Sequence, residues 1–171
     1  GDSDRPIAVG DKVLPYSQRF LGHPAWSRTE PKIAFTSERG DRWEILMTDA
    51  TGRGPSLFPG LSSYASSGYP AWSPDGRRIA FASTEAGNWD IYVINADGTG
   101  RVQLTVHPAS DWAPVWSPDG RWIAFSSTRD GMGNLFLVRD DGSETIRLTR
   151  GSAFDHFPAW RSIDLILDRD G

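Results

Sequence analysis

Tyr-Pro-Ala-Trp-Ser-Pro-Asp-Gly-Arg-Arg-Ile-Ala-Phe, residues 69–81, is the stretch that decides the fold. A short strand ending near Trp72 leads into the turn at 73–76, where Pro presets φ, Asp bonds nearby backbone and Gly takes the positive φ. The apolar run that follows, from about Arg78 to Ser83, has the composition of a strand buried on both faces. The stretch therefore predicts two strands joined by a tight turn.

The same unit recurs along the chain, and such repeats come first because they govern the whole fold. Its Trp stands at positions 26, 72, 116 and 160, at spacings of 46, 44 and 44 residues. The run Ile-Ala-Phe follows at 33–35, 79–81 and 123–125, and a second apolar run follows at 43–47, 89–93 and 134–138. Agreement at so many offsets excludes chance.

Each repeat predicts four short strands, A to D. In the second repeat, strand A contains Trp72, strand B spans about 78–83, strand C about 90–95 and strand D about 102–105. No segment shows helical periodicity after an N-cap. Four strands with turn signals between them, repeated every 40–45 residues or so, are typical of a β-propeller blade. We therefore predict an all-β fold, a single β-propeller domain spanning 1–171, with four-stranded antiparallel blades.

The predicted blades are 23–68, 69–112 and 113–156. Residues 157–171 and 1–22 can form a fourth blade, with strand B at 163–168, strand C at 4–9 and strand D at 12–14. Such a clasp would close the ring and leave no open sheet edge. The alternative is an open arc, either a fragment or half of a dimer that completes a larger ring. Pro6 is awkward inside a central strand and counts against the clasp.

Composition excludes several classes of partner and chemistry. The formal net charge is −4, so no basic field attracts nucleic acid or anionic lipid. No apolar run reaches the length of about 18 residues that a membrane span needs, so we expect no membrane insertion. The chain has no Cys, which excludes disulfides, thiolate zinc sites and a Cys nucleophile.

We expect the chain not to be an enzyme. It lacks the Gly-x-Ser-x-Gly elbow of serine hydrolases, a Gly-rich phosphate loop and a zinc-protease helix. Asp111 and Asp155 are the one carboxylate pair that could be nominated for glycosidase chemistry.

The unit at 70–81, followed by Asp-Ile-Tyr-Val-Ile-Asn-Ala-Asp-Gly at 90–98 and Gln-Leu-Thr at 103–105, resembles the TolB-like propeller repeat. The resemblance covers about 23–160. It implies a β-propeller, mostly found in bacterial periplasmic or secreted proteins, and non-enzymatic adaptor function, although the same repeat also builds the propeller of prolyl-oligopeptidase-type proteases. The chain has fewer repeats than the usual six and no N-terminal α/β domain, so the resemblance implies the class and not the partner.

The candidate binding residues lie in the D–A and B–C loops, which crowd one face of a propeller around its channel. Aromatic, His and acidic side chains gather there, as on many recognition surfaces. The set is Tyr69, Trp89, Asp111, Trp112, Asp155 and His156.

Asp111 and Asp155 share one offset, five residues before their Trp. They predict either a cation site or partner anchor, or else capping of the strand entry. Calcium is possible, but it needs six or more oxygens and two carboxylates do not supply them. The four repeated Trp residues predict packing between blades, with each N–H finding a backbone acceptor.

These observations favour a non-catalytic binding module for a protein or peptide. A carbohydrate-binding module is the alternative, with Tyr69, Trp89 or Trp112 stacking on sugar rings. A hydrolase, or a gating propeller from one, is the third possibility. We expect no resident cofactor and a periplasmic or extracellular location in bacteria.

Overall fold

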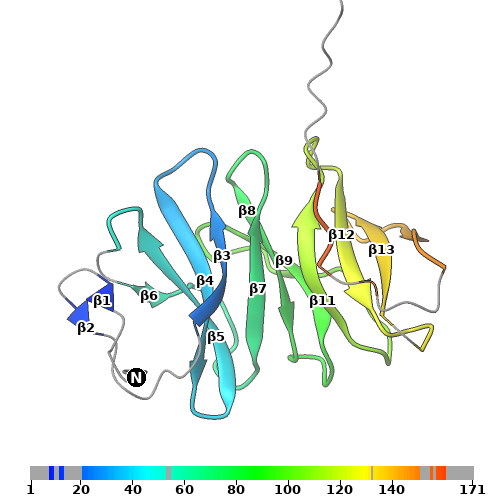
Figure 1. Ribbon diagram of the computed structural model, residues 1–171, viewed down its shortest axis with the longest axis horizontal. Helices are drawn as coiled ribbons and strands as arrows, with labels where there is room; N and C mark the ends of the chain where they lie inside the picture. Colours follow the sequence, from blue (N-terminus) through cyan, green and yellow to red (C-terminus); the bar gives the residue numbers. More distant parts are fainter. Residues whose placement is uncertain are drawn as a thin grey trace, which may run out of the picture.

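The computed structural model describes residues 8–9, 12–13, 21–52, 55–131, 133–150, 155 and 157–160. Three four-stranded antiparallel sheets stand in a row (Figure 1). The first contains β3 (Leu21–Trp26), β4 (Lys32–Arg39), β5 (Arg42–Asp49) and β6 (Ser56–Leu57). The second contains β7 (Ser67–Trp72), β8 (Arg78–Ser83), β9 (Asp90–Asn95) and β10 (Val102–Gln103). The third contains β11 (Asp111–Trp116), β12 (Trp122–Ser127), β13 (Asn134–Arg139) and β14 (Thr145–Arg147).

The sheets confirm the all-β prediction and the four-strand repeat. Each sheet is one predicted repeat, with strands in sequence order from the inner strand outward. The inner strands β3, β7 and β11 begin two residues before the predicted repeat boundaries, at Leu21, Ser67 and Asp111. In the part of the chain that the structure describes, no helix is long and apolar enough to cross a membrane.

The turn after the inner strand follows the predicted chemistry. Ser73 Oγ lies 2.6 Å from Asp75 Oδ1, which accepts the backbone N–H two residues on at 3.1 Å. The same contacts recur at 117–121 in the third sheet. Gly76 has φ +69°, and a Cβ there would lie 1.8 Å from Thr29 Oγ1 of the first sheet. Glycine is therefore required by both the turn and the close approach of the neighbouring sheet.

The sheets pack face to face through the Ile-Ala-Phe strands. In β8, Ile79 and Phe81 face the first sheet, whereas Ala80 and Ala82 face the third. Large side chains of the third sheet fill the space over these alanines: Trp116, Ile123, Phe125, Phe136 and Val138. Burial on both faces explains why the strand is a continuous apolar run rather than an alternating one.

Trp116 and Trp160 join neighbouring sheets as predicted. Trp72 packs against the core between the first and second sheets, but its Nε1–H has no hydrogen-bond partner among the described residues, so that part of the prediction is wrong for it. Trp116 is 5% exposed and donates its Nε1–H to Ala71 O of the second sheet at 3.1 Å. Trp160 donates to Val115 O, the equivalent atom of the third sheet, at 3.2 Å. Trp26 is 59% exposed, so the packing prediction is wrong for this residue. Its side of the first sheet has no four-stranded neighbour within the described residues.

The fourth blade is described only in pieces. β1 (Ala8–Val9) and β2 (Lys12–Val13) pair antiparallel with each other, at the predicted positions of strands C and D. They lie beyond the first sheet, whereas 157–160 contacts the third sheet at the other end of the row (Figure 1). The predicted strand at 163–168 lies outside the described residues, so closure of the ring stays a prediction.

The exposure difference between two equivalent Trp residues generates a test. We expect Trp116→Ala to lower the free energy of unfolding by about 3–5 kcal/mol, because it empties a core site between sheets. Trp26→Ala should cost less than about 1 kcal/mol, since most of its ring is in solvent. Urea unfolding measures both. An equally large loss for Trp26 would show that this face is covered in solution, by a closing blade or by a second copy.

Candidate functional site

Four equivalent residues with left-handed backbone mark the centre of the row. His23, Tyr69, Ala113 and Phe157 have φ of 51°, 55°, 53° and 56°, and each precedes a proline. In each of the three inner strands, the pairing with the next strand shifts register at the left-handed residue, as in a β-bulge. A bulge re-aims its side chain, and holding a non-glycine residue in this conformation costs about 1–3 kcal/mol. The four residues and the prolines after them line one shallow pocket of about 160 Å³.

This convergence has a simple geometric meaning. The residues come from four successive repeats and occupy the same position in each. Inner strands that present equivalent residues to one pocket surround a common centre. The pocket is therefore the place where the repeats meet.

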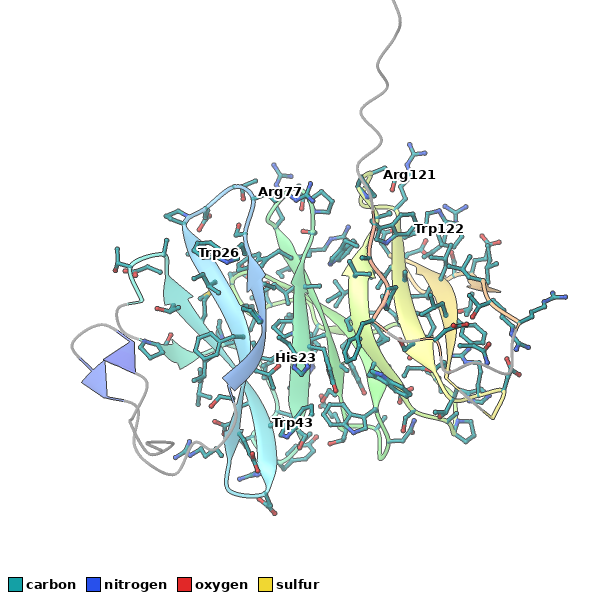
Figure 2. The ribbon with its side chains drawn as sticks, viewed as in Figure 1. His23, Trp26, Trp43, Arg77, Arg121 and Trp122 are labelled. Carbon is teal, nitrogen blue, oxygen red and sulfur yellow. The ribbon has the colours of Figure 1, made fainter. Side chains whose placement is uncertain are left out.

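Five aromatic side chains form a continuous cluster beside this pocket: His23, Trp43, Tyr69, Trp89 and Phe157. We call them the aromatic cluster. The ring centroids of His23 and Tyr69 are 4.0 Å apart, those of Trp43 and Tyr69 are 5.6 Å apart, and those of Trp43 and Trp89 are 5.5 Å apart. Tyr69 and Phe157 are 6.3 Å apart. In Figure 2, His23 and Trp43 lie toward the end of the sheets opposite Arg77 and Arg121.

The cluster is built by the first and second sheets together with Phe157. Trp43 and Trp89 hold the same offset in the first two repeats, and the third repeat has Gly133 there. Likewise the third repeat has Ala113 where the others have His, Tyr and Phe. Ala113 of the third sheet therefore lines the pocket beside the aromatic side chains of the first two sheets.

The cluster is uncharged at neutral pH. Burial lowers the pKa of the His23 imidazole below its ordinary value of 6.5. Burial also raises the pKa of the Tyr69 hydroxyl. Both groups are therefore neutral at pH 7, and the cluster presents aromatic surface rather than charge.

Asp111 does not lie on the surface, contrary to the sequence-based prediction of a cation site or partner anchor. Its side chain is 0% exposed, and its Oδ2 accepts a hydrogen bond from Arg129 Nη2 at 2.7 Å. Arg129 is held in turn by its Nε–H to Ser127 Oγ at 2.9 Å. The backbone N–H of Asp111 donates to Trp89 O at 2.7 Å. The residue thus braces the interior beneath the aromatic cluster.

A second buried acid, Asp90, belongs to the same interior layer and was missed in the sequence. It is 1% exposed, accepts from Gln103 Nε2 at 3.1 Å and lies 3.3 Å from Thr105 Oγ1. Burial, and then the charge of Asp111, raise the pKa of Asp90. The repeat could have revealed this position, because Asn134 holds the same offset and is also 1% exposed.

The other predicted residues are distributed as follows. Tyr69 and Trp89 come together in the aromatic cluster. Trp112 is half-buried and packs against the core between the second and third sheets. Asp155 is partly exposed, with its backbone N–H donating to Gly133 O at 2.8 Å. His156 lies outside the described residues. Among the described residues, no group of three or more His, Asp or Glu could hold a metal ion.

Three members of the cluster were not among the predicted site residues: His23, Trp43 and Phe157. The sequence contains the signal that identifies them. His23 and Phe157 share the offset of Tyr69, and Trp43 shares that of Trp89.

The buried pair of Asp111 and Arg129 generates a stability prediction. Asp111→Ala should lower the free energy of unfolding by about 3 kcal/mol, because it leaves a largely buried guanidinium without its partner. Asp130→Ala is the matched control. It breaks a 3.0 Å pair with Arg147 in which both side chains are about a third exposed, and should cost less than about 1 kcal/mol. Similar losses in the two variants, measured by urea unfolding, would contradict a bracing role.

The lowered pKa of His23 generates a pH prediction. As pH falls below 6.5, the unfolded chain takes up the proton before the folded chain does, so the free energy of unfolding decreases. The loss is complete once pH is below the folded pKa. We expect His23→Phe to lack this contribution, measured as the difference from the parent chain in denaturant unfolding between about pH 5 and 7.5. Parallel pH profiles for both proteins would contradict the prediction.

Comparison with known proteins supports the architecture. A sequence profile described as the TolB beta propeller domain matches residues 9–165. A TolB-like protein from Agrobacterium tumefaciens superposes with a TM-score of 0.73 and 29% identity, over 81% of this chain and 50% of that protein. No curated protein sequence matches the chain.

More distant structures share the fold alone. TolB from Acinetobacter baumannii gives a TM-score of 0.65 at 20% identity, over 79% of this chain and 34% of that protein. A puromycin hydrolase gives 0.61 at 17% identity, over 78% of this chain and 22% of the enzyme. The chain therefore spans half or less of the length of each of these proteins. The sheet repeat, the shared centre and the profile match over most of the sequence agree, and the chain belongs to the TolB β-propeller domain family.

Proposed function

We propose that this chain is a non-catalytic binding propeller that recognises a protein or peptide through its aromatic cluster. One observation carries the proposal: aromatic side chains from separate repeats converge beside the pocket where those repeats meet. Aromatic side chains dominate the affinity of protein interfaces, because they bury large areas at low entropic cost. Ala113 of the third sheet lines the pocket beside them.

The scaffold under the cluster is suited to recognition because it is rigid. Tyr69 is held by its backbone N–H to Thr36 Oγ1 of the neighbouring sheet at 3.0 Å, and Phe157 by the equivalent bond to Ser126 Oγ at 3.2 Å. Side chains on strands that are fixed in this way lose little conformational freedom when a partner binds.

The contacts of the candidate acids support a binding role over catalysis. A glycosidase would need Asp111 and Asp155 to face a substrate together. Asp111 is instead sealed in the interior and neutralised by Arg129. The ring centroids of His23 and Tyr69 lie 4.0 Å apart with their planes tilted by 38°, so the pair presents aromatic surface.

The proposal extends to the cellular location of the protein and to closure of the propeller ring. A periplasmic or secreted location fits membership of this family and a chain without Cys. We further propose that the exposed face around Trp26 is covered in a closed ring, by the fourth-blade clasp or by a second copy. Light scattering separates the two, since the clasp requires a monomer and the second copy a dimer.

Selection from a random peptide display library tests the binding function. Peptides that bind the parent chain should lose about tenfold or more in affinity with Tyr69→Ala and with Trp89→Ala, as expected when a central aromatic contact is removed. Trp122→Ala is the control, because Trp122 lies near the other end of the sheets (Figure 2) and stacks with Arg139 at 4.5 Å. The proposal fails if no peptide is selected while a glycan array gives strong binding, or if the control variant loses affinity equally.

A further inference from the structure

A second hollow lies beside the first sheet and is lined by none of the four left-handed residues. We call it the first-sheet pocket. It has a volume of about 350 Å³ and lies among β5, β6 and the segment 58–67. Sites for small ligands have volumes of roughly 300–1,000 Å³. Its wall combines apolar side chains, among them Leu57, Phe58 and Leu61, with the guanidinium groups of Arg39 and Arg42.

The other two sheets place a long polar side chain at the position equivalent to Leu57. In the second sheet, Gln103 Nε2 donates to Asp90 Oδ2 at 3.1 Å and to Thr105 O at 2.9 Å. In the third sheet, Arg147 Nε donates to Thr149 O at 2.7 Å. In each case this side chain bonds back to its own sheet, and beside Gln103 the second sheet has a pocket with a different lining, which includes Tyr64, Tyr92 and Arg101.

The first sheet has different residues at these three positions. Leu57 stands where Gln103 and Arg147 stand, Pro59 replaces the threonines, and Glu44 replaces Asp90. Leucine cannot donate the hydrogen bonds that Gln103 and Arg147 donate, and proline has no hydroxyl like that of Thr105, which bonds Asp90. Leu57 is 53% exposed as a result. An apolar lining with two arginines is therefore a property of this sheet and not of the repeat.

An insertion builds the outer wall. Trp72 lies fourteen positions after Phe58, whereas Trp116 lies twelve positions after Leu104. Phe58 and Leu104 are equivalent, since each donates its backbone N–H at 2.8 Å to a carbonyl of the third strand of its sheet, Ile45 O and Ile91 O respectively. The two extra residues thus fall in the segment that follows Phe58 and contributes Leu61 and Ser63 to the pocket.

The polar groups at the pocket favour an anion. Arg42 donates from Nη1 to Ser63 O, and its Nε lies 3.8 Å from Asp41, which is 96% exposed. Arg39 Nη1 lies 3.8 Å from Glu44 Oε1, beyond hydrogen-bond distance. Both guanidinium groups keep donors available, and two cations against Glu44 leave a net positive lining. Guanidinium groups bind carboxylates through paired, charge-assisted hydrogen bonds.

We propose that the first-sheet pocket binds a carboxylate joined to an apolar side chain, with Arg39 and Arg42 holding the carboxylate and Leu57, Phe58 and Leu61 holding the apolar part. A free hydrophobic acid and the C-terminal residue of a peptide both present this chemistry. Trp43 lines this pocket and also belongs to the aromatic cluster, but the inference does not rest on the function proposed for that cluster.

Calorimetric titration of the full chain tests the inference with three probes: N-acetyl-phenylalanine, its uncharged amide, and a hexapeptide ending in phenylalanine. We expect the acid or the peptide to bind, and the amide to bind about tenfold or more weakly, because it loses a charge-assisted hydrogen bond. A free-acid site binds the two acids equally. A peptide site binds the hexapeptide more tightly.

Variants identify the pocket. Arg39→Gln and Arg42→Gln should each weaken the acid about tenfold. Arg77→Gln, at the other end of the sheets (Figure 2), should leave affinity unchanged. Equal binding of acid and amide, no binding of any probe, or equal loss with Arg77→Gln would overturn the inference.

A triple variant gives the first sheet the residues that the second sheet has at the three equivalent positions. Glu44→Asp, Leu57→Gln and Pro59→Thr copy residues that already fold in the neighbouring repeat, so the variant should remain folded by circular dichroism. It should weaken acid binding about tenfold or more, because a polar side chain replaces the leucine that holds the apolar part of the ligand. Retention of full affinity in a folded triple variant would locate binding elsewhere and overturn the inference.

Discussion

Large side chains of one sheet packing over small side chains of its neighbour hold this molecule together. Ile123 and Phe125 of the third sheet cover Ala80 and Ala82 of the second, and Ile79 and Phe81 of the second sheet face the first. Fully burying one such side chain contributes about 1.5–3 kcal/mol. Because every Ile-Ala-Phe strand has one large face and one small face, each sheet requires a neighbour on both sides. The need for neighbours, rather than any property of one sheet, produces the stack.

The function proposed here follows from that stack. Sheets that pack side by side bring their inner strands to one centre, and the left-handed residue before each proline turns its side chain there. The strain at these four positions is tolerated because backbone bonds such as Tyr69 N–H to Thr36 Oγ1 hold them in place. Beneath them, Asp111, Arg129 and Asp90 form a polar interior layer that leaves the surface above it aromatic and uncharged.

The repeat made the fold predictable and the site only partly so. The turn at 73–76, the four strands and the bond from Trp116 to the preceding sheet all follow from residue type at a repeated offset. Tyr69 and Trp89 come together as predicted from the gathering of loops at one end of a propeller, although Tyr69 lies in β7. Asp111 was wrongly predicted to be exposed, because a carboxylate in a predicted loop is expected to be in solvent unless its ionic partner is known. That partner, Arg129, lies 18 residues further along the chain. Trp26 was wrongly predicted to be buried, because burial of this Trp depends on a preceding sheet and not on residues of its own repeat.

Differences between repeats carry more functional information than their agreement. Positions that agree, such as the Trp and the turn Asp, are explained by packing and backbone bonding. Positions that break the pattern are not demanded by the fold: Ala113 lines the central pocket where the other repeats present an aromatic ring, and Leu57 lines the first-sheet pocket where the other repeats have a long polar side chain. Both breaks change the side chains that a pocket presents. A scaffold of similar repeats thus acquires an individual site where one repeat departs from the shared sequence. Each departure can be reversed by copying the residue of the neighbouring repeat.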